Sequence, residues 1–476
     1  MTPPSAPALE TPPSRAVNEG YRSVLKNRTF VLLWLGQVFS QLGDRVVFVI
    51  FIAAITAYYG ANDRYNSYLY IAFTIPAILL TAIAGVFVDR WPRRLTLVTT
   101  NLCRAALLAF LPMAAHQGLM GIYALAFLVS SATQFFVPAE SATIPLVVRK
   151  TQLMTANSLF TTTMMGSVIF GFALGDPLIN IFSLEQVHWA VVGLFLLAGG
   201  VLCFVKPPGD PSAARLRPTQ RDVLNSLRRF GAEMHEGVAY ILERRVILKT
   251  ILKLALLFSV VVAMCILFIS FARDFLYDNP AVASRKFAYI VTFSGIGMSA
   301  GALVVGRFFR DAGRQRMAYG GFLAIGTFLL AMAQMDWIPK HAMLFGVPAQ
   351  SVSLGGGLQL FLERFPLTLR MALTYGLSTL MGVAAAFVAI PLQSLLHEVI
   401  PDDKRGKIMG VQFTLLSTAS TLPVLAAGLG VEYFGTAAML NLMGAPVFAV
   451  GLFGLMRLIA RARERRHHAH SAAEDW

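Results

Sequence analysis

Long apolar runs recur from one end of the chain to the other, and they limit its possible folds more than any other feature. A helix needs about 20 apolar residues to cross roughly 30 Å of hydrocarbon. Strands of a membrane barrel would alternate polar and apolar residues, which these runs do not. With 56% hydrophobic and 14% charged residues, no segment has the polar surface of a soluble domain. The sequence therefore predicts an all-α membrane protein with twelve transmembrane helices, near 30–58, 67–88, 95–115, 119–137, 155–180, 187–205, 247–271, 286–308, 317–333, 371–396, 408–430 and 436–459.

Lys and Arg gather at alternate ends of these runs, and the formal net charge is +15. The loops at the opposite ends are nearly bare of such residues, and "HQGLM" and "SLEQVH" carry no Lys or Arg. This positive-inside pattern predicts a multi-pass protein of the cell (inner) membrane with both termini in the cytoplasm. The expected partner of the basic charge is the anionic lipid headgroups of the cytoplasmic face, with nucleic acid a poor alternative.

The runs fall into two sets of six. Residues 1–26 read as a disordered cytoplasmic tail, and 206–246 as a cytoplasmic linker with an amphipathic helix between the halves 27–205 and 247–460. Parity of the crossings makes 334–370 an extracytoplasmic loop, and 461–476 is a basic cytoplasmic tail. "GVFVDRWPRR" after the second run is echoed by "GRFFRDAGRQR" after the eighth. Two six-helix pseudo-repeats of this kind are typical of transporters.

The first run holds charged residues in the middle of an apolar segment, "FSQLGDRVVFV" at 39–49. Either charge costs about 3 kcal/mol at the centre of a membrane helix. Gln37, Ser40, Gln41 and Asp44 recur at spacings of three, four and seven, so they share one helix face. At ~1.5 Å per residue Asp44 lies ~21 Å along the helix from Phe30. A polar face at that depth should line a cavity rather than meet lipid.

Asp44 needs a partner at its own depth. Arg45 is ~100° further around the helix and is a poor candidate, whereas Arg104 in the third run lies at a comparable depth. A carboxylate whose partner moves between two conformations could bind and release a proton in each cycle. We therefore predict that Asp44 and Arg104 couple transport to protons. The alternative is a static pair that locks the first span to the third.

Several motifs resemble one known family. "GVFVDRWPRR" is similar to the loop 2–3 signature of the major facilitator superfamily, with Pro92 where Gly is usual. "NRTFVLLWLGQVFSQLGD", "PAESATIPLVVRKTQLMTANSL" and "PLQSLLHEVIPDDKRGKIMGV" resemble its drug:proton antiporter branch, related to enterobactin exporters and macrolide efflux pumps. The resemblance covers about 27–460. It implies a rocker-switch carrier with a central cavity between its two six-helix halves.

The loop 2–3 signature suggests a gate on the cytoplasmic side. Gly85 would let the second span approach a neighbouring helix, and Asp89 would accept hydrogen bonds from Arg93 or from the start of a facing helix. Gly85, Asp89 and Arg93 are therefore expected to gate, while Arg90 and Arg94 are expected to enforce topology.

The fifth run, "GFALGDPLIN", resembles the family's glycine-rich antiporter motif. Gly171, Gly175 and Pro177 would allow tight packing or a bend. For Asp176 a structural or vestibular role outranks proton coupling. Glu140 and Glu398 are expected at inner membrane exits, where they read first as cap or loop-pairing residues.

Other polar residues in the runs are cavity-lining candidates, although most are expected simply to hydrogen-bond between helices. Beside Gln37, Ser40 and Gln41, these candidates are Gln134, Asn157, Thr161, Gln393 and Gln412.

No enzyme signature is found. The chain has no G-x-x-x-x-G-K-[ST] phosphate loop, no G-x-S-x-G elbow and no Cys/His metal cluster, so we expect neither a cofactor nor a metal. Without a nucleotide site, uphill transport must use an ion gradient. The prediction is proton-coupled efflux of an amphipathic small molecule, a drug or a siderophore, by a monomer. The alternatives are a lysophospholipid flippase of the same fold and a non-transporting receptor or scaffold.

Overall fold

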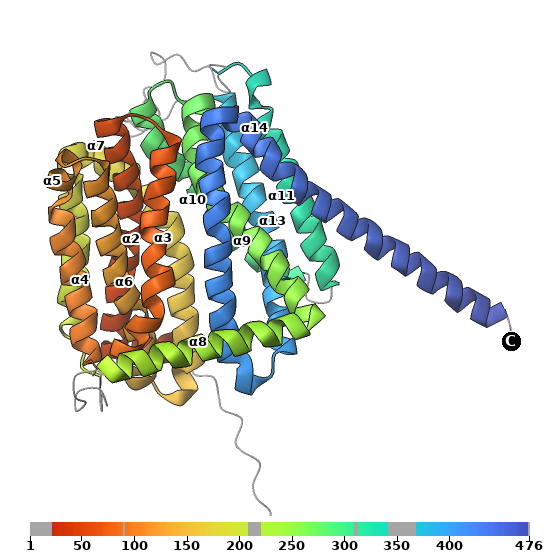
Figure 1. Ribbon diagram of the computed structural model, residues 1–476, viewed down its shortest axis with the longest axis horizontal. Coiled ribbons are helices and arrows are strands. Elements are labelled where there is room, and N and C mark those ends of the chain that lie inside the picture. Colours follow the sequence, from red (N-terminus) through yellow and green to blue (C-terminus); the bar gives the residue numbers. More distant parts are fainter. Residues whose placement is uncertain (1–20, 89–90, 208–219, 309–312, 341–367, 475–476) are drawn as a thin grey trace, which may run out of the picture.

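Every regular element of the computed structural model is a helix across its described residues, 21–88, 91–207, 220–308, 313–340 and 368–474 (Figure 1). The predicted loop 334–370 lies mostly outside these ranges, as do residues 1–20 of the predicted tail. The first elements are α1 (Tyr21–Leu25), α2 (Arg28–Tyr59), α3 (Asp63–Val88), α4 (Arg93–Ala109), α5 (Leu111–His116), α6 (Leu119–Val147), the 3-10 turn η1 (Lys150–Gln152) and α7 (Leu153–Leu202). They are followed by α8 (Gln220–Glu243), α9 (Arg245–Phe271), the π-helical turn η3 (Ala272–Leu276), α10 (Pro280–Phe308), α11 (Arg314–Ala333), the 3-10 turn η4 (Met335–Trp337), α13 (Leu369–Val399) and α14 (Asp402–Glu474).

Two of these helices are far too long for one crossing. α7 has 50 residues and α14 has 73, which correspond to ~75 and ~110 Å of helix. The backbone of α7 leaves helical geometry at Ser183, with φ 63°, and that of α14 at Gly435, with φ 80°. A residue at positive φ turns the chain, which glycine does without steric penalty. With both counted twice and α8 left aside, the described residues form twelve long helical segments in the order predicted for the twelve crossings.

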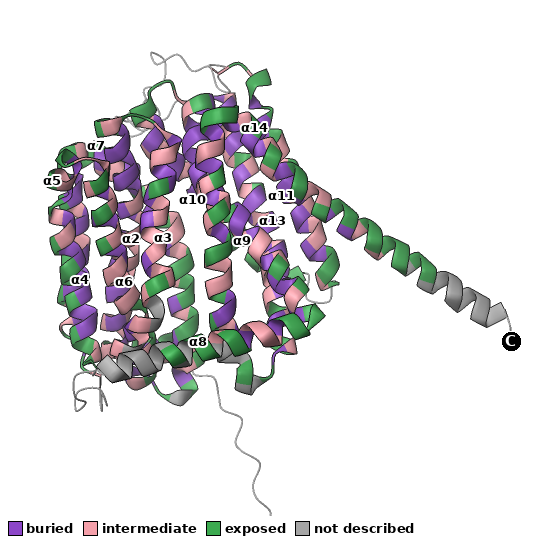
Figure 2. Ribbon diagram, in the orientation of Figure 1, coloured by how far each residue is buried: buried purple, intermediate pink, exposed green. Residues whose placement is uncertain are grey.

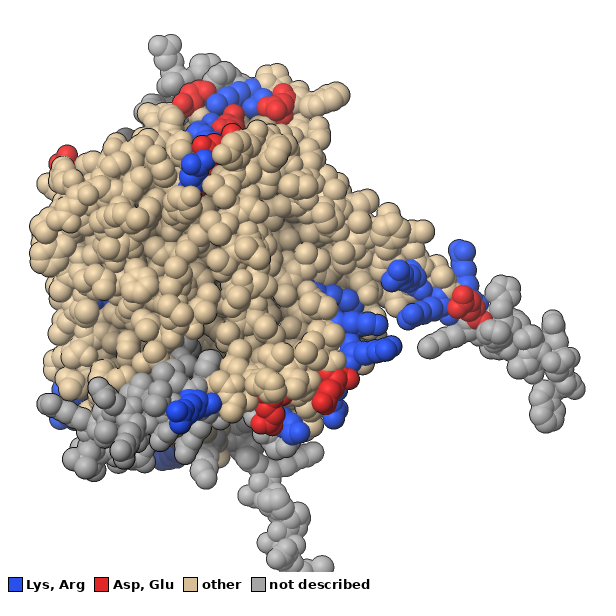
Figure 3. All heavy atoms as spheres, viewed as in Figure 1, with Lys and Arg blue, Asp and Glu red and all other residues tan. Residues whose placement is uncertain are grey.

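The surface has the distribution expected of a membrane protein. Lys, Arg, Asp and Glu gather toward the two ends of the bundle in Figure 3, and a broad band of uncharged residues separates them. Within the described ranges, eight helices have the length and hydropathy needed to cross a bilayer, and α7 and α14 belong to this set. The prediction of an all-helical, multi-span membrane protein is confirmed.

The crossings form two groups, which we name the first half (α2–α7) and the second half (α9–α14). α8 crosses one end of the bundle beneath both groups (Figure 1) and packs against α3, α9 and α14. It occupies the segment where an amphipathic linker helix was expected. Gly237 of α8 lies against Val411 of α14, and a Cβ on this glycine would come within 2.5 Å of the valine. The end of the bundle opposite α8 contains Gly60, Ser183 and Gly435.

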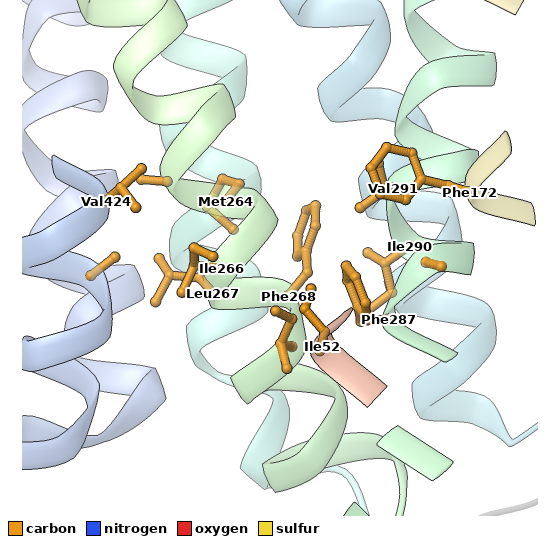
Figure 4. Packing of buried hydrophobic residues seen from close by; sticks show 14 of the residues in the cluster. Ile52, Phe172, Met264, Ile266, Leu267, Phe268, Phe287, Ile290, Val291 and Val424 are labelled. Carbon is orange, nitrogen blue, oxygen red and sulfur yellow. The ribbon is translucent and has the colours of Figure 1, made fainter. Parts of the chain in front are cut away.

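Buried apolar side chains from both halves form one core, which Figure 2 shows as the purple interior of the bundle. Figure 4 shows Phe172 of the first half and Phe287 of the second at close range, and their ring centroids lie 6.5 Å apart. Thr292 of α10 donates to the backbone oxygen of Ile169 in α7. The halves are therefore joined by dry packing over part of their common surface.

Glycines set the closest helix contacts of the second half. A Cβ built on Gly297 of α10 would lie 1.9 Å from the backbone oxygen of Thr379, and one on Gly382 of α13 would lie 2.0 Å from that of Ser294. Side chains at these positions cannot fit while the helices stay where they are, so small residues fix this crossing.

Gly382→Ala should therefore lower the stability of the protein by about 1–3 kcal/mol, because α10 and α13 must separate. Gly376→Ala is the matched control in the same helix, since no atom lies within 4 Å of the Cβ it would add. Thermal unfolding of the purified variants in detergent measures both. Equal unfolding temperatures for the two variants would contradict the close crossing.

Candidate functional site

The strongest cluster of polar groups lies inside the first half, where α2, α4 and α6 meet. Arg104 of α4 is fully buried, with a side-chain exposure of 0%. Its Nη1 donates to both carboxylate oxygens of Asp44, at 2.9 and 3.1 Å. Its Nη2 donates to Ser40 Oγ and to Asn101 Oδ1, each at 2.9 Å, and its Nε to the backbone oxygen of Thr100 at 3.4 Å. All three guanidinium nitrogens thus donate to an acceptor.

Two aromatic rings cover the faces of this guanidinium. Phe136 of α6 lies 4.9 Å from Arg104 Cζ and Phe195 of α7 lies 4.6 Å from it. The Phe195 ring also packs against Gly43, where a Cβ would meet it at 3.0 Å. Cation–π contacts of this kind are strongest when water is excluded. Arg104 is therefore held on its edges by hydrogen bonds and on its faces by rings.

Asp44 differs from its partner in one respect that bears on chemistry. The Asp44 side chain keeps 22% of its surface exposed, whereas Arg104 keeps none. Part of the carboxylate is therefore accessible from outside the protein, whereas the cation is not. Protonation would remove the negative charge that balances Arg104, and breaking such a buried pair is strongly unfavourable. A change in the charge of Asp44 would therefore change the electrostatic environment of the buried Arg104.

The sequence prediction for this pair matches the geometry, since Arg104 and not Arg45 contacts Asp44. Of the shared polar face, Ser40 joins the pair. Gln37 instead donates to the backbone oxygen of Phe160 in α7 at 3.4 Å.

Glu140 lies deeper in the bundle than the sequence suggested. α6 continues to Val147, so Glu140 sits about two turns inside the helix rather than at a membrane exit. It is one turn from Phe136, the residue that covers Arg104, and it is buried, with Oε1 lacking a hydrogen-bond partner. The interpretation of Glu140 as a cap or loop-pairing residue was wrong, because apolar residues on both sides extend the helix past it.

Glu398 occupies the exposed position that was expected. It accepts two hydrogen bonds of 2.6 Å from Arg314 at the start of α11. Arg314 is the second-half counterpart of Arg93, whose Nη1 donates to the backbone oxygen of Ala142 at 3.0 Å. Both arginines thus connect neighbouring helices of their own half.

Gly85 and Arg94, the remaining gate candidates within the described residues, show no close contact. No atom of the described residues lies within 4 Å of a Cβ built on Gly85, so the expected close approach of α3 is not made in this conformation. Arg94 is exposed. Asp89 and Arg90 lie outside the described residues.

The other polar candidates are spread over several helices. Gln412 of α14 donates to Gln393 of α13 at 3.1 Å, and Gln134 donates to the backbone of its own helix at Ser130. Gln41 is half-buried, and Asn157 and Thr161 are exposed near the start of α7. The structure does not gather these six residues into one site.

The glycines of α7 lie against α2. A Cβ on Gly171 would meet the Cβ of Arg45 at 2.5 Å, and one on Gly175 would meet Val49 at 2.7 Å. Pro177 is inside the same helix. The small residues of this motif therefore let α2 and α7 pack in close contact.

Sequence reasoning missed a set of ion pairs at the end of the bundle opposite α8. Arg273 of η3 contacts the carboxylate of Asp63 in α3 at 2.8 Å and that of Asp274 at 2.8 Å. Ser270 donates to the same Asp63 at 2.6 Å. Arg64 contacts Glu432 of α14 at 2.7 Å. The pairs from Arg273 to Asp63 and from Arg64 to Glu432 join the first half to the second, whereas Arg273 and Asp274 belong to the same half.

Asp176 belongs to a second connection between the halves. It is buried in α7, its Oδ1 lies 3.1 Å from Nε of Arg285 in α10, and Tyr289 of α10 donates to its Oδ2 at 3.2 Å. The only sequence signal for these contacts was that the charges lie near the ends of apolar runs. Among the residues that the structure describes, no group of His, Cys, Asp and Glu side chains is arranged to hold a metal ion.

Comparison with known proteins agrees with this architecture. The family model "Major Facilitator Superfamily" matches residues 33–371. The chain is 25% identical over 434 residues to the "Uncharacterized MFS-type transporter YfiS" of Bacillus subtilis (strain 168), which covers 90% of this chain and 94% of that protein.

Two solved structures share the fold. The nucleoside transporter NupG aligns with a TM-score of 0.63 at 12% identity over 91% of this chain and 98% of its own. A bacterial homologue of the iron transporter ferroportin, in an inward-facing state, aligns with a TM-score of 0.60 at 15% identity over 90% and 98%. With a family model that matches most of its length and a fold shared with these transporters, the chain belongs to the major facilitator superfamily and is a secondary transporter, not an enzyme.

Proposed function

We propose that the chain is a proton-coupled exporter of small amphipathic molecules and that Asp44 carries the coupling proton. The observation that supports this most is the unequal exposure of the pair, 22% for Asp44 and 0% for Arg104. A proton carrier must exchange with water while its change of charge is sensed inside the protein. The resemblance of several motifs to the drug:proton antiporter branch supports export as the direction of transport.

Alternating access requires contacts that form at one end of the bundle and break at the other. The ion pairs from Arg273 to Asp63 and from Arg64 to Glu432 lie opposite α8. With the termini in the cytoplasm, as the basic loops suggest, these pairs close the extracytoplasmic end. Protonation of Asp44 would weaken its hold on Arg104, loosen α2 against α4 and so favour rearrangement of the first half.

An apolar surface groove keeps the lysophospholipid flippase as a second candidate. It lies between α2 and the second crossing of α7, and an acyl chain could rest in it. Its lining residues are Leu32, Gly193, Leu196, Leu197, Gly200, Val201 and Phe204. Neither Asp44 nor Arg104 lines this groove, so proton-coupled export of a soluble amphipathic molecule remains the primary proposal.

The direct test uses everted vesicles from cells that overexpress the protein, with vesicles from a deletion strain as control. Respiration acidifies the vesicle lumen, so an exporter that exchanges protons should accumulate an amphipathic dye there. Fluorescein and rhodamine 6G are suitable because they share a ring system and carry opposite charges. Nigericin, which collapses the pH gradient, should release the accumulated dye. Accumulation that persists after nigericin would count against proton coupling.

A further inference from the structure

Arg45 is the charged residue in the middle of α2 that the mechanism above does not use. It follows Asp44 directly, about halfway along the helix. Its Nε is buried and has no hydrogen-bond partner, and no contact within the described residues holds its guanidinium as Asp44 holds that of Arg104. The side chain is half-buried, so part of it remains accessible.

The surroundings of Arg45 place it at the boundary between the halves. Its Cβ and Cγ lie against Gly171 of α7, where a Cβ would come within 2.5 and 2.9 Å of them. Cys265, about three-quarters of the way along α9 of the second half, is close enough to interact electrostatically with the guanidinium. The side chain therefore lies against α7 of its own half and near α9 of the other half.

Asp44 does not neutralise this charge on its own. Both of its oxygens accept from Arg104, so one carboxylate faces two arginines. A lone cation at this depth costs about 3 kcal/mol on an insertion scale. Such a residue is retained inside a membrane protein when it serves a pathway or a ligand. The absent partner of Arg45 is then expected to be an anion that comes and goes.

We propose that Arg45 binds the anionic group, a carboxylate or phosphate, of the transported amphipathic molecule, an inference that rests on the proposed export function. A guanidinium offers paired donors that match the oxygens of either group. Because the side chain reaches from the first half toward α9, a bound anion would lie between the halves, where alternating access can expose it to either side. The apolar remainder of the molecule would lie against the neighbouring hydrophobic core.

Stability separates this role from a structural one. Arg45→Gln removes a charge that makes no hydrogen bond or ion pair within the described residues, so the variant should unfold at the wild-type temperature or above it. A clear fall in unfolding temperature would show that Arg45 supports the fold, which overturns the proposal.

The binding test is a fluorescence anisotropy titration of fluorescein, an anion, and of rhodamine 6G, a cation, with purified protein in detergent. Fluorescein should bind the wild type, and Arg45→Gln should weaken that binding about 10-fold or more. Arg45→Lys should retain part of the affinity because it keeps the charge. Arg307→Gln is the matched control, since Arg307 is exposed at the end of α10, and it should bind as the wild type does.

A competition arm distinguishes a lipid anion from a soluble one. Displacement of fluorescein by lysophosphatidylglycerol but not by lysophosphatidylcholine would assign the site to a lipid phosphate. Absence of displacement by either lipid would assign it to a soluble anion, and in both cases Arg45 binds an anion. Failure of fluorescein to bind, or equal binding by Arg45→Gln, overturns the anion site. Dye accumulation in the everted vesicles tests the export function separately. If rhodamine 6G is exported while fluorescein does not bind, the export function is retained and the anion site at Arg45 is rejected.

Discussion

Combining Asp44→Asn with Arg104→Gln should restore much of the stability that either substitution removes alone, without restoring transport against a gradient. Arg104 is sealed from solvent, so Asp44→Asn leaves a buried cation without its counter-charge. Arg104→Gln leaves the Asp44 carboxylate without the cation that donates to both of its oxygens. Breaking one partner of a buried pair costs about 3–5 kcal/mol, whereas removing both charges is often nearly neutral.

Unfolding of the four proteins in detergent gives the coupling energy of the pair. The matched control is the same cycle at Arg314 and Glu398, a bidentate pair whose side chains are 40% and 59% exposed. That cycle should yield about 1 kcal/mol or less. Equal coupling energies for the two pairs would contradict the burial of Arg104. Full uphill transport by the double variant would favour the static lock between α2 and α4.

Arg273→Gln should change the equilibrium between the conformation described above and one that is open at the end opposite α8. The ratio of the first to the second should fall by about 10-fold or more. Arg273 contacts Asp63, a buried carboxylate of the other half, at 2.8 Å. A hydrogen bond to a charged group contributes about 1.5–3 kcal/mol, and tenfold in an equilibrium corresponds to about 1.4 kcal/mol. Without this contact the end opposite α8 should open more often.

The same measurement on Arg64→Gln provides the control. Arg64 also joins α3 to the second half, through Glu432, but these side chains are 33% and 36% exposed, so its loss should change the conformation little. Spin labels at the exposed positions Tyr58 and Tyr433 report the end opposite α8. A second pair at Leu95 and Phe308 reports the α8 end, with the native cysteines replaced by serine.

Arg273→Gln should lengthen the first distance and shorten the second, because the two ends open in alternation. Lengthening at both ends would mean that the bundle had simply loosened. An equal response to Arg64→Gln would mean that the buried contact to Asp63 has no special role.

The pairing of Asp44 with Arg104 could be predicted from sequence because both residues interrupt apolar runs at similar depth. Depth along a helix follows from residue counting alone. The contact of Arg273 with Asp63 could not be predicted from sequence, because 210 positions separate them. Each also lies at a helix end, where charged residues normally meet water. Only the packing of the two halves brings them together.

Glu140 and Gly85 show the limits of reading single helices. Glu140 was placed at a membrane exit because the end of its span was set about ten residues too early, before α6 ends at Val147. Gly85 matches a motif for close helix contact, but the contact depends on the relative position of the halves. A sequence motif is the same in every conformation of a transporter, whereas a contact exists in only some of them.

Transport by Asp44→Asn in proteoliposomes tests the central claim most directly. The purified variant and the wild type are reconstituted, and the dye that the wild type moves, fluorescein or rhodamine 6G, is followed under an imposed pH gradient and then at equilibrium exchange. We expect the wild type to accumulate dye against its gradient and Asp44→Asn to fail, while both exchange internal for external dye. Uphill accumulation by Asp44→Asn at the wild-type rate and pH dependence would contradict the assignment of Asp44 as the proton carrier.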